Sequence, residues 1–341
     1  MPELPEVATV RAGLADDSLG RPVRAVRVVD ARSLRRHLPG PVDFEAALTG
    51  RALRGAYRRG KYLWLTLSEA DGTLAEEALV VHLGMSGQLL VRDEPGGVSG
   101  SDSEARAAFD EQPRHLRVAL ELGPAGATGS MVSTNRASTR QRLLFVDQRI
   151  FGGMFLSPLV SDVPAAVAAN KVALGEVPER FLVPEAVKHI ARAPLDAFFD
   201  PAAVRRKFLR TSSGIKKVLL DQSVISGVGN IYADEALWRA RLHYAKPART
   251  LSAAQTRELL EAVTQVLRES LAAGGTSFDA LYVNVLGESG YFERSLNAYG
   301  RAGEPCHRCA EVGRTSLIVR EPFQNRSSYR CPHCQRAPRS R

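Results

Sequence analysis

The chain has 341 residues, 44% of them hydrophobic and 24% charged, which is the composition of a globular protein with room for two or three domains. No apolar run approaches the roughly 18 residues that a membrane-spanning helix needs. The first residues are acidic where a signal peptide would be basic and then apolar. We therefore expect a cytoplasmic protein and exclude a membrane protein.

The net charge of +9 is distributed unevenly. Residues 1–200 contain 24 Lys and Arg against 25 Asp and Glu, whereas residues 201–341 contain 22 against 12. Such asymmetry is typical of a protein that binds a polyanion. An acidic partner protein or simple solubility remains an alternative.

The first 160 residues have the pattern of a β protein that follows one helix. A helix is expected over 4–17. Apolar runs bounded by Gly or polar residues predict strands within 62–67, 78–91, 115–122 and 142–147. Because long Gly- and Ser-rich loops separate these short strands, we expect a sandwich or a barrel.

From about residue 200 the pattern becomes helical. Asp200 followed by Pro201 is typical of a helix N-terminus. The stretch 252–275 begins with a capping box of Ser252 and Gln255 and ends at two glycines. We place the domain boundary near residue 199, after a segment rich in Ala, Pro and Val.

All four cysteines lie near the C-terminus, as two Cys-x2-Cys pairs with 21 residues between them: Cys306, Cys309, Cys331 and Cys334. This spacing predicts one tetrahedral zinc site with a β-hairpin between the pairs. With no ligand position left open, the metal would be structural. The nearby His307 and His333 are expected to be bystanders.

Several residues outside the cysteine pairs suggest contact with phosphate or bases. Gly227 and Gly229 predict a tight turn that opens a helix, whose amide groups would be available to an anion, with Asn230 as its cap. Lys61 stands before a strand, and Arg326 near the tip or return strand of the hairpin. An interhelical turn and solvated side chains remain alternatives.

Two loop motifs, "HLGMSG" and "DQRIFGG", contain Met85, Arg149 and Phe151. Arg149 and Phe151 are two residues apart and would lie on the same side of an extended segment. Such residues could wedge into a base stack and occupy the gap left by an extruded nucleotide. Core packing is the alternative for Met85 and Phe151.

The chain opens with "MPELPEV", in which Pro2 is followed by Glu3 and Glu6. Taken alone, this stretch could be a lead-in to the first helix, with Glu in its first turn.

In combination, these motifs resemble the formamidopyrimidine-DNA glycosylases, within the wider family that includes endonuclease VIII. The resemblance runs from residue 1 to about residue 336 and rests on "MPELPEV", "RRGKYL", "HLGMSG", "D-x-R-x-F-G", "GVGNIYADEAL", "GGTSF", "GYF" and the cysteine pairs. The opening motif favours the formamidopyrimidine branch.

The resemblance implies an α+β fold in three parts, with DNA bound in a cleft. These are an N-terminal β-sandwich with flanking helices (1–199), a helix-two-turns-helix domain (200–290) and a zinc finger (291–341). It implies a monomeric, nucleoid-associated enzyme whose partner is double-stranded DNA with oxidised bases or abasic sites.

The resemblance also implies roles for individual residues. Removal of Met1 would make the secondary amine of Pro2 the nucleophile, with Glu3 as the acid that assists sugar ring opening and Glu6 as a second carboxylate. Lys61 would assist elimination. The void left by the flipped lesion would be filled by Met85, Arg149 and Phe151, and backbone phosphates would be held by His82, His115, Lys216, Asn230 and Arg326. The segment 282–292 matches a loop that closes over an oxidised purine.

The sequence departs from the family pattern at Ala8, Gln148 and Ile150, and the inserts 92–113 and 123–141 match no family segment.

Because Pro2, Glu3 and Lys61, to which the resemblance assigns the chemistry, are all present, we expect a bifunctional glycosylase and abasic-site lyase for oxidised purines. Two alternatives are an endonuclease VIII-like enzyme for oxidised pyrimidines and a catalytically silent damage-binding protein.

Overall fold

The computed structural model describes residues 2–93, 112–125, 140–164, 167, 177–275, 284–287 and 292–338. Most of the two inserts and most of the loop expected over 282–292 lie outside the described residues. The chain divides into two compact units, which are described separately. The first contains Met1–Pro2, Glu6–Lys188 and Ser277–Gly290, and the second contains Glu3–Pro5, His189–Thr276 and Tyr291–Arg341.

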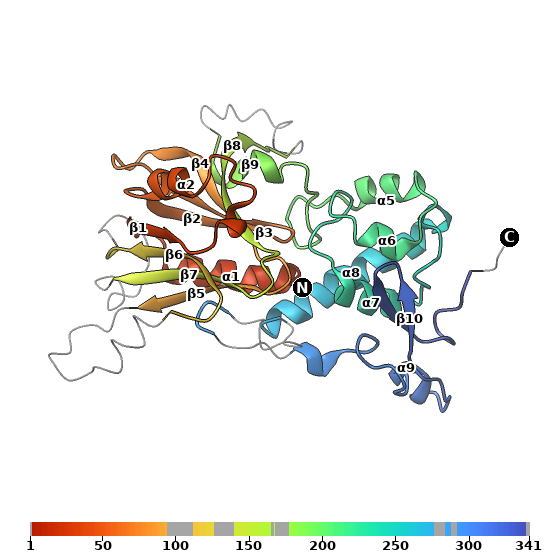
Figure 1. Cartoon of the computed structure of the whole chain (residues 1–341). Helices are drawn as coiled ribbons and strands as arrows, with labels where there is room; N and C mark the ends of the chain where they lie inside the picture. Colours follow the sequence, from red (N-terminus) through yellow and green to blue (C-terminus); the bar gives the residue numbers. More distant parts are fainter. Residues whose placement is uncertain are drawn as a thin grey trace. The chain divides into compact units, whose positions relative to one another are not determined.

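The first unit is built mainly of antiparallel strands (Figure 1). Its strands are β1 (Val23–Val28), β2 (Ala52–Arg59), β3 (Tyr62–Ser68), β4 (Leu74–His82), β5 (Gly87–Asp93), β6 (Leu116–Leu122), β7 (Gln141–Asp147), β8 (Gly153–Ser161) and β9 (Leu182–Pro184). Its helices and 3-10 turns are α1 (Leu4–Asp17), η1 (Ala31–Leu34), α2 (Pro41–Leu48), η2 (Glu179–Phe181) and η3 (Glu185–Val187).

These strands form two sheets, one in the order β1-β6-β7-β5 and the other in the order β2-β3-β4-β8-β9. Both sheets contribute buried Leu, Val and Phe side chains to one core, which also takes in Val10 and Leu14 of α1 and Phe44 of α2. The predicted β-sandwich with flanking helices is therefore confirmed. The helix expected over 4–17 corresponds to α1, and the apolar run 78–91 is divided between β4 and β5 by a turn.

The second unit is helical and ends in a small hairpin. Its elements are α5 (Pro201–Leu209), α6 (Ile215–Leu219), α7 (Asn230–Arg239), η4 (Ala248–Thr250), α8 (Ala253–Ala272), η5 (Phe292–Ser295), α9 (His307–Ala310), β10 (Val319–Phe323) and β11 (Arg326–Arg330). The Asp200 side chain accepts hydrogen bonds from the first amides of α5. The capping box of Ser252 and Gln255 is present at the start of α8. Both helix starts therefore agree with the sequence prediction.

The core of the second unit is organised around α7 and α8. Apolar side chains of α8, among them Leu259, Val263 and Val266, pack with Tyr232 and Ala236 of α7 in one buried cluster. These apolar side chains of α8 are therefore part of the core of the second unit. No helix in the described parts of either unit has both the length and the apolar character needed to cross a bilayer.

Candidate nucleic-acid interface and metal centre

The two loop motifs of the first unit lie against each other. Met85 occupies the turn between β4 and β5, and Arg149 and Phe151 occupy the turn between β7 and β8. A side chain at Gly84 would overlap the backbone at Gly152, so this approach requires glycine. The structure thus brings together the three residues that the sequence suggested as a wedge.

Asp147, at the end of β7, holds both turns in place. Its carboxylate accepts hydrogen bonds from Ser86 Oγ at 2.6 Å, from the Arg149 amide at 3.1 Å and from the Gly152 amide at 2.8 Å. Asp147 is fully buried. The sequence analysis did not single out Asp147, although an acid between a strand and a Gly-containing turn is a signal for such a role.

One detail of the second turn differs from the sequence expectation. The segment is not extended, because Ile150 has a φ of 56°, a left-handed conformation that β-branched residues rarely adopt. Arg35 supports this bend by donating hydrogen bonds to the carbonyl groups of Ile150 and Phe151. The bend leaves Phe151 52% exposed, and Met85 is 39% exposed, so core filling does not account for either side chain.

Lys61 and His82 lie at one end of the β2-β3-β4 sheet. Lys61 is the second residue of a two-residue turn between β2 and β3, and Tyr62 directly after it pairs with His82. Lys61 is buried. Burial, with the positive charges of Arg36 and Lys61, lowers the pKa of His82 to about 4.

The hydrogen bond of His82 also indicates its tautomer. The Gly84 amide donates to Nδ1 of His82 at 3.1 Å. A neutral ring that accepts at Nδ1 carries its proton on Nε2, and that proton is then available to an acceptor such as a phosphate oxygen.

The remaining predicted residues of the first unit are Pro2, Glu6 and His115. Pro2 and Glu6 are buried, and Glu6 is in the first turn of α1. His115 has a φ of 68°, and its carbonyl accepts a hydrogen bond from the Asp147 amide at 3.1 Å. His115 therefore adjoins the strand end that organises the two turns.

In the second unit, Glu3 is held by the start of α7. Its carboxylate accepts hydrogen bonds from the Gly229 amide at 2.6 Å and from the Ile231 amide at 3.1 Å. Glu3 is only 2% exposed. The expected anion at this helix start is therefore a carboxylate of the chain itself. The expectation that Asn230 caps α7 is wrong, because Gly229 is the N-cap and Glu3 satisfies the amides.

The glycine turn before α7 is shaped to receive the N-terminal segment. The Leu4 amide donates to the Gly227 carbonyl at 3.0 Å. Gly227 has a φ of 87°, and a side chain there would overlap Leu4. The Gln222 side chain bridges the turn, accepting from the Gly227 amide at 2.9 Å and donating to the Val228 carbonyl at 2.9 Å.

Lys216 and Asp234 form a fully buried ion pair of 2.7 Å. Asp234 also accepts hydrogen bonds from the Ser328 hydroxyl and the Tyr329 amide, and Lys216 donates to the Ser327 carbonyl. Burial raises the pKa of Asp234 to about 6, although Lys216 and these hydrogen-bond donors act to lower it. This pair joins α6 and α7 to strand β11, a role that the sequence analysis did not anticipate for either residue.

Asn230 and Arg326 lie near the same hairpin. Asn230 Nδ2 donates to the Ser327 carbonyl at 3.1 Å. Arg326 begins β11, directly after the two-residue turn that starts with Gln324, as expected for the tip or return strand. Arg326 is exposed, and within the described part of the chain its guanidinium makes no hydrogen bond or ion pair. It is therefore available to an external anion.

The four cysteines come together as predicted. Their Sγ atoms all lie within 4.8 Å of one another, and the group contains no other residue: Cys306, Cys309, Cys331 and Cys334. Strands β10 and β11 form the expected hairpin between the two pairs. These thiolates could hold one metal ion.

The cysteine cluster is attached to α7 through Trp238. The indole Nε1 donates to Cys306 Sγ at 3.4 Å, and Trp238 packs with three of the cysteines and Ile318 in one buried cluster. Glu235, also on α7, accepts hydrogen bonds from the Ala298 and Tyr299 amides. The stretch "YADEALW" therefore organises the C-terminal module as well as its own helix.

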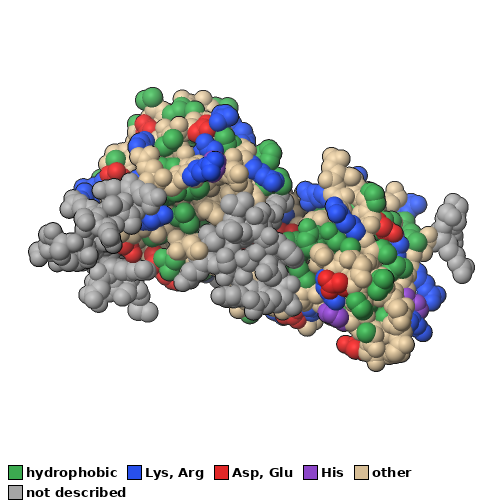
Figure 2. Space-filling model, turned by 60° about the horizontal axis from the view of Figure 1, so that its bottom comes forward, with side chains coloured by type: hydrophobic (Ala, Val, Ile, Leu, Met, Phe, Trp, Pro, Cys, Tyr) green, Lys and Arg blue, Asp and Glu red, His purple; other side chains and the backbone are tan. Residues whose placement is uncertain are grey.

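Basic side chains lie on the surfaces of both units in the view of Figure 2. A strand-rich unit with two turns held by Asp147, and a helical unit that fixes a four-cysteine hairpin beside an exposed arginine, are typical of DNA-binding proteins with a helix-two-turns-helix domain and a metal-binding hairpin.

Comparison with known proteins identifies the family within this class. Residues 1–154 match the family model of the formamidopyrimidine-DNA glycosylase N-terminal domain, and residues 190–281 match that of the formamidopyrimidine-DNA glycosylase H2TH domain. Proteins named formamidopyrimidine-DNA glycosylase from Nocardia farcinica and Acidothermus cellulolyticus are 50% and 47% identical, over 100% and 99% of this chain and equal shares of their own. The chain belongs to the formamidopyrimidine-DNA glycosylase family.

Solved structures agree with this assignment. The complex of Lactococcus lactis Fpg with abasic-site-containing DNA superimposes with a TM-score of 0.70 at 25% identity. The complex of MutM with DNA containing carbocyclic 8-oxo-G gives a TM-score of 0.71 at 26% identity. Each comparison covers 98% of this chain and 100% of the other.

Proposed function

We propose that this protein is a bifunctional DNA glycosylase and abasic-site lyase that excises oxidised purines from duplex DNA in base excision repair. The names of its full-length relatives and the DNA in the similar structures support this substrate class. The observation that carries the proposal is Glu3: a buried carboxylate, directly after Pro2, is fixed by two backbone amides.

The chemistry begins at Pro2 once Met1 has been removed. An α-amino group titrates near ~8, so a useful fraction of the secondary amine is neutral at pH 7. Its attack on C1′ of the damaged nucleotide releases the base and forms an iminium ion. Because a tertiary iminium nitrogen has no proton to lose, it remains an electron sink, and elimination of the 3′-phosphate and then of the 5′-phosphate follows.

Carboxyl groups beside the amine move the protons. Glu3 acts as the acid that assists opening of the sugar ring, and Glu6, buried in the first turn of α1, positions water or tunes Pro2. Lys61 assists elimination at a phosphate. Arg326 supplies a guanidinium that can bind a phosphate through two donors.

The clamped turns hold the DNA in the extruded state. Met85 and Phe151 are apolar, exposed and anchored, as a wedge in a base stack requires, and Arg149 faces the orphaned base. Backbone phosphates are bound by His82, His115 and Asn230, and for His82 the Nε2 proton supports this role. Lys216, to which the resemblance assigns the same role, is fully buried in its ion pair with Asp234, so it positions the hairpin through the Ser327 carbonyl and does not contact a phosphate itself.

The metal of the cysteine cluster is one structural Zn²⁺. Zinc–thiolate bonds of about 2.3 Å in a tetrahedron give sulfur–sulfur distances of about 3.8 Å. The distances from Cys309 Sγ to Cys331 Sγ and Cys334 Sγ, 3.7 and 3.5 Å, are close to this value. The zinc would crosslink the module. We further propose a monomer in the cytoplasm, associated with the nucleoid, and keep the three-part division 1–199, 200–290 and 291–341.

Borohydride trapping on a duplex with one 8-oxoguanine opposite cytosine tests this function. The untagged protein should form a covalent adduct that maps to Pro2, and Pro2→Gly should lose lyase activity while still binding DNA. Equal cutting of a thymine glycol duplex would refute the purine assignment. Tight binding without any adduct would leave a catalytically silent damage binder.

A further inference from the structure

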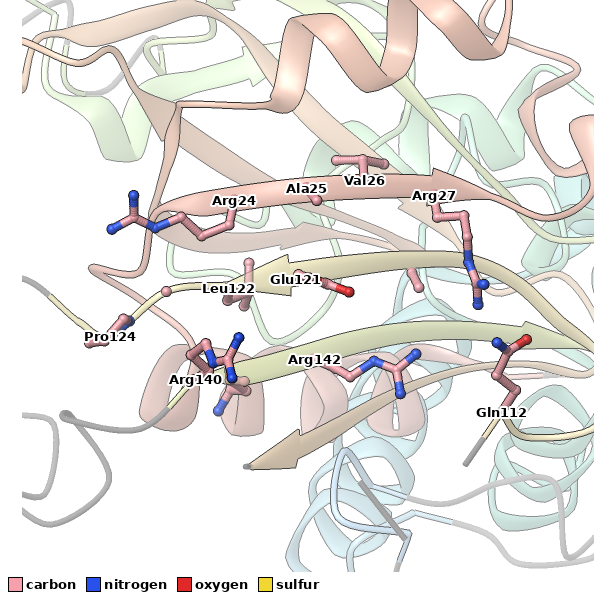
Figure 3. Close-up of a pocket in the computed structure, with 13 residues that line it drawn as sticks. Arg24, Ala25, Val26, Arg27, Gln112, Glu121, Leu122, Pro124, Arg140 and Arg142 are labelled. Atoms are coloured by element: carbon pink, nitrogen blue, oxygen red, sulfur yellow. The ribbon is translucent and has the colours of Figure 1, made fainter. Parts of the chain in front are cut away.

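A second polar site lies on the outer face of the β1-β6-β7-β5 sheet in the first unit. A pocket of about 690 Å³ is lined there by strands β1, β6 and β7 and the residues that flank them (Figure 3). None of its lining residues belongs to the candidate site described above. A volume of this size is typical of small-molecule sites.

The pairing of the strands explains why this face is hollow. Ala25 lies opposite Glu121, which lies opposite Arg142, and Arg27 lies opposite Ala119. Directly paired residues point to the same face of a sheet. The two alanines therefore form a low floor between long side chains.

The rim of the pocket is strongly basic. It contains four arginines and one carboxylate: Arg24, Arg27, Arg140, Arg142 and Glu121. Arg24 and Arg27 are exposed, and among the described residues neither guanidinium has a hydrogen bond or ion pair. An exposed arginine without a carboxylate partner, as Arg24 and Arg27 are within the described part of the chain, is suited to bind a phosphate or carboxylate group.

The charges form two groups along the strands. In Figure 3 the guanidinium groups of Arg27 and Arg142 turn to the same end of the pocket as Gln112, and Arg24 and Arg140 lie at the other end. Arg24 and Arg27 are three residues apart on β1, which corresponds to about 10 Å. A ligand that reaches both ends must carry negative charge over that length.

We infer that this pocket binds a polyphosphorylated small molecule of nucleotide size. The phosphate groups contact the arginines, and the low floor of Ala25 and Ala119 leaves room for the uncharged body of the ligand. An acidic peptide would also find positive charge here, but a hollow of this volume between long side chains suits a compact molecule better than an extended chain.

Calorimetric titration of the full-length protein with ATP, tripolyphosphate and adenosine tests this site. ATP should bind saturably with one site per chain, tripolyphosphate should compete with it, and adenosine should bind at least tenfold more weakly. Absence of saturable ATP binding up to millimolar concentrations, or adenosine binding as tightly as ATP, would overturn the inference.

Variants separate the pocket from diffuse attraction. Removing both free arginines, Arg24→Ala with Arg27→Ala, should weaken ATP binding at least tenfold, whereas Glu121→Gln should strengthen it. The matched control removes two exposed arginines of the second unit, Arg210→Ala with Arg257→Ala, and should change binding less than twofold. Equal losses in both double variants would mean nonspecific charge and would refute a built site.

Two further measurements distinguish the remaining explanations. Ala25→Phe fills the floor without changing charge and should abolish ATP binding, and retained binding would contradict the pocket. If a short undamaged duplex displaces ATP, and the Arg24/Arg27 variant loses affinity for that duplex equally, the pocket is a DNA contact and the small-molecule inference fails. Cutting of the 8-oxoguanine duplex reports the proposed enzymatic function independently.

Discussion

Substitution of Gly229 by alanine is a direct test of how Glu3 is positioned. Gly229 has ordinary extended dihedral angles, so alanine introduces no backbone strain. Its Cβ, however, would lie 2.7 Å from Glu3 Cγ and closer still to Cδ and Oε1. The carboxylate must therefore leave the amides of Gly229 and Ile231.

The cost can be worked from the two hydrogen bonds that are lost. A hydrogen bond to a charged group contributes about 1.5–3 kcal/mol, so the loss of both bonds to Glu3 should cost about 3–6 kcal/mol. Hydrogen bonds that the displaced carboxylate then forms with water reduce this cost. The free energy of unfolding should fall by about 3 kcal/mol. If Glu3 is the general acid, its displacement should also reduce the cutting rate about 10²- to 10⁴-fold.

A double-mutant cycle isolates this effect. Glu3→Ala removes the atoms with which the new methyl group would collide, so Gly229→Ala should cost less than 1 kcal/mol in that background. Urea unfolding of the four proteins gives the stabilities, and single-turnover cutting of the 8-oxoguanine duplex gives the rates. If Gly229→Ala destabilises both backgrounds equally, the amides of α7 do not hold Glu3, and the reasoning is refuted.

Three further outcomes are expected. Asp147→Asn should lower the free energy of unfolding by about 2–4 kcal/mol and weaken DNA binding about tenfold, because the clamp of both turns loses its charged acceptor; unchanged DNA affinity would contradict the clamp. Because the pKa of His82 is about 4 in the folded protein and about 6.5 in the unfolded chain, protonation of the unfolded chain should cost about 3 kcal/mol of the free energy of unfolding as the pH falls from 6.5 towards 4. In His82→Asn, the free energy of unfolding measured in urea should therefore change less between pH 7.5 and 5 than in the unmodified protein. The same pH dependence in both proteins would refute this assignment. Metal analysis of the untreated protein should give one zinc per chain. In a Trp64→Phe variant, in which Trp238 is the remaining tryptophan, removal of the metal should shift the fluorescence to longer wavelength, because Trp238 contacts Cys306. An unshifted spectrum would contradict the packing of Trp238 against the metal module.

Local signals made much of this fold predictable. The caps at Asp200 and Ser252 depend on interactions within four residues, so the sequence contains all the information needed. Strand β3 was visible because its leucines alternate. Strands β1 and β2 were missed because they mix Arg, Gly and Ala with few large apolar residues, and only their pairing with β6 and β3 makes them strands.

The site was predictable in its residue types but not in its contacts. Two cysteine pairs specify a tetrahedral site by spacing alone, which is why the metal cluster was foreseen. The contact of Glu3 with Gly229 spans 226 residues, and that of Lys216 with Ser327 spans 111, so no local pattern could indicate them. The bend at Ile150 depends likewise on Asp147 and on Arg35, which is distant in sequence.

These long-range contacts explain why the same motifs serve both folding and the chemistry that we propose. The start of α7 would be an anion site in an isolated helix, and in this protein the Glu3 carboxylate occupies it, so the amides of Gly229 and Ile231 fix its position. A group that must give up a proton to a sugar and then recover it benefits from a fixed position more than from an extreme pKa. The rigidity of the glycine turn, which fixes Glu3, is therefore the contribution of Gly227 and Gly229 to the reaction that we propose, while Asn230 in the same motif keeps its proposed phosphate contact.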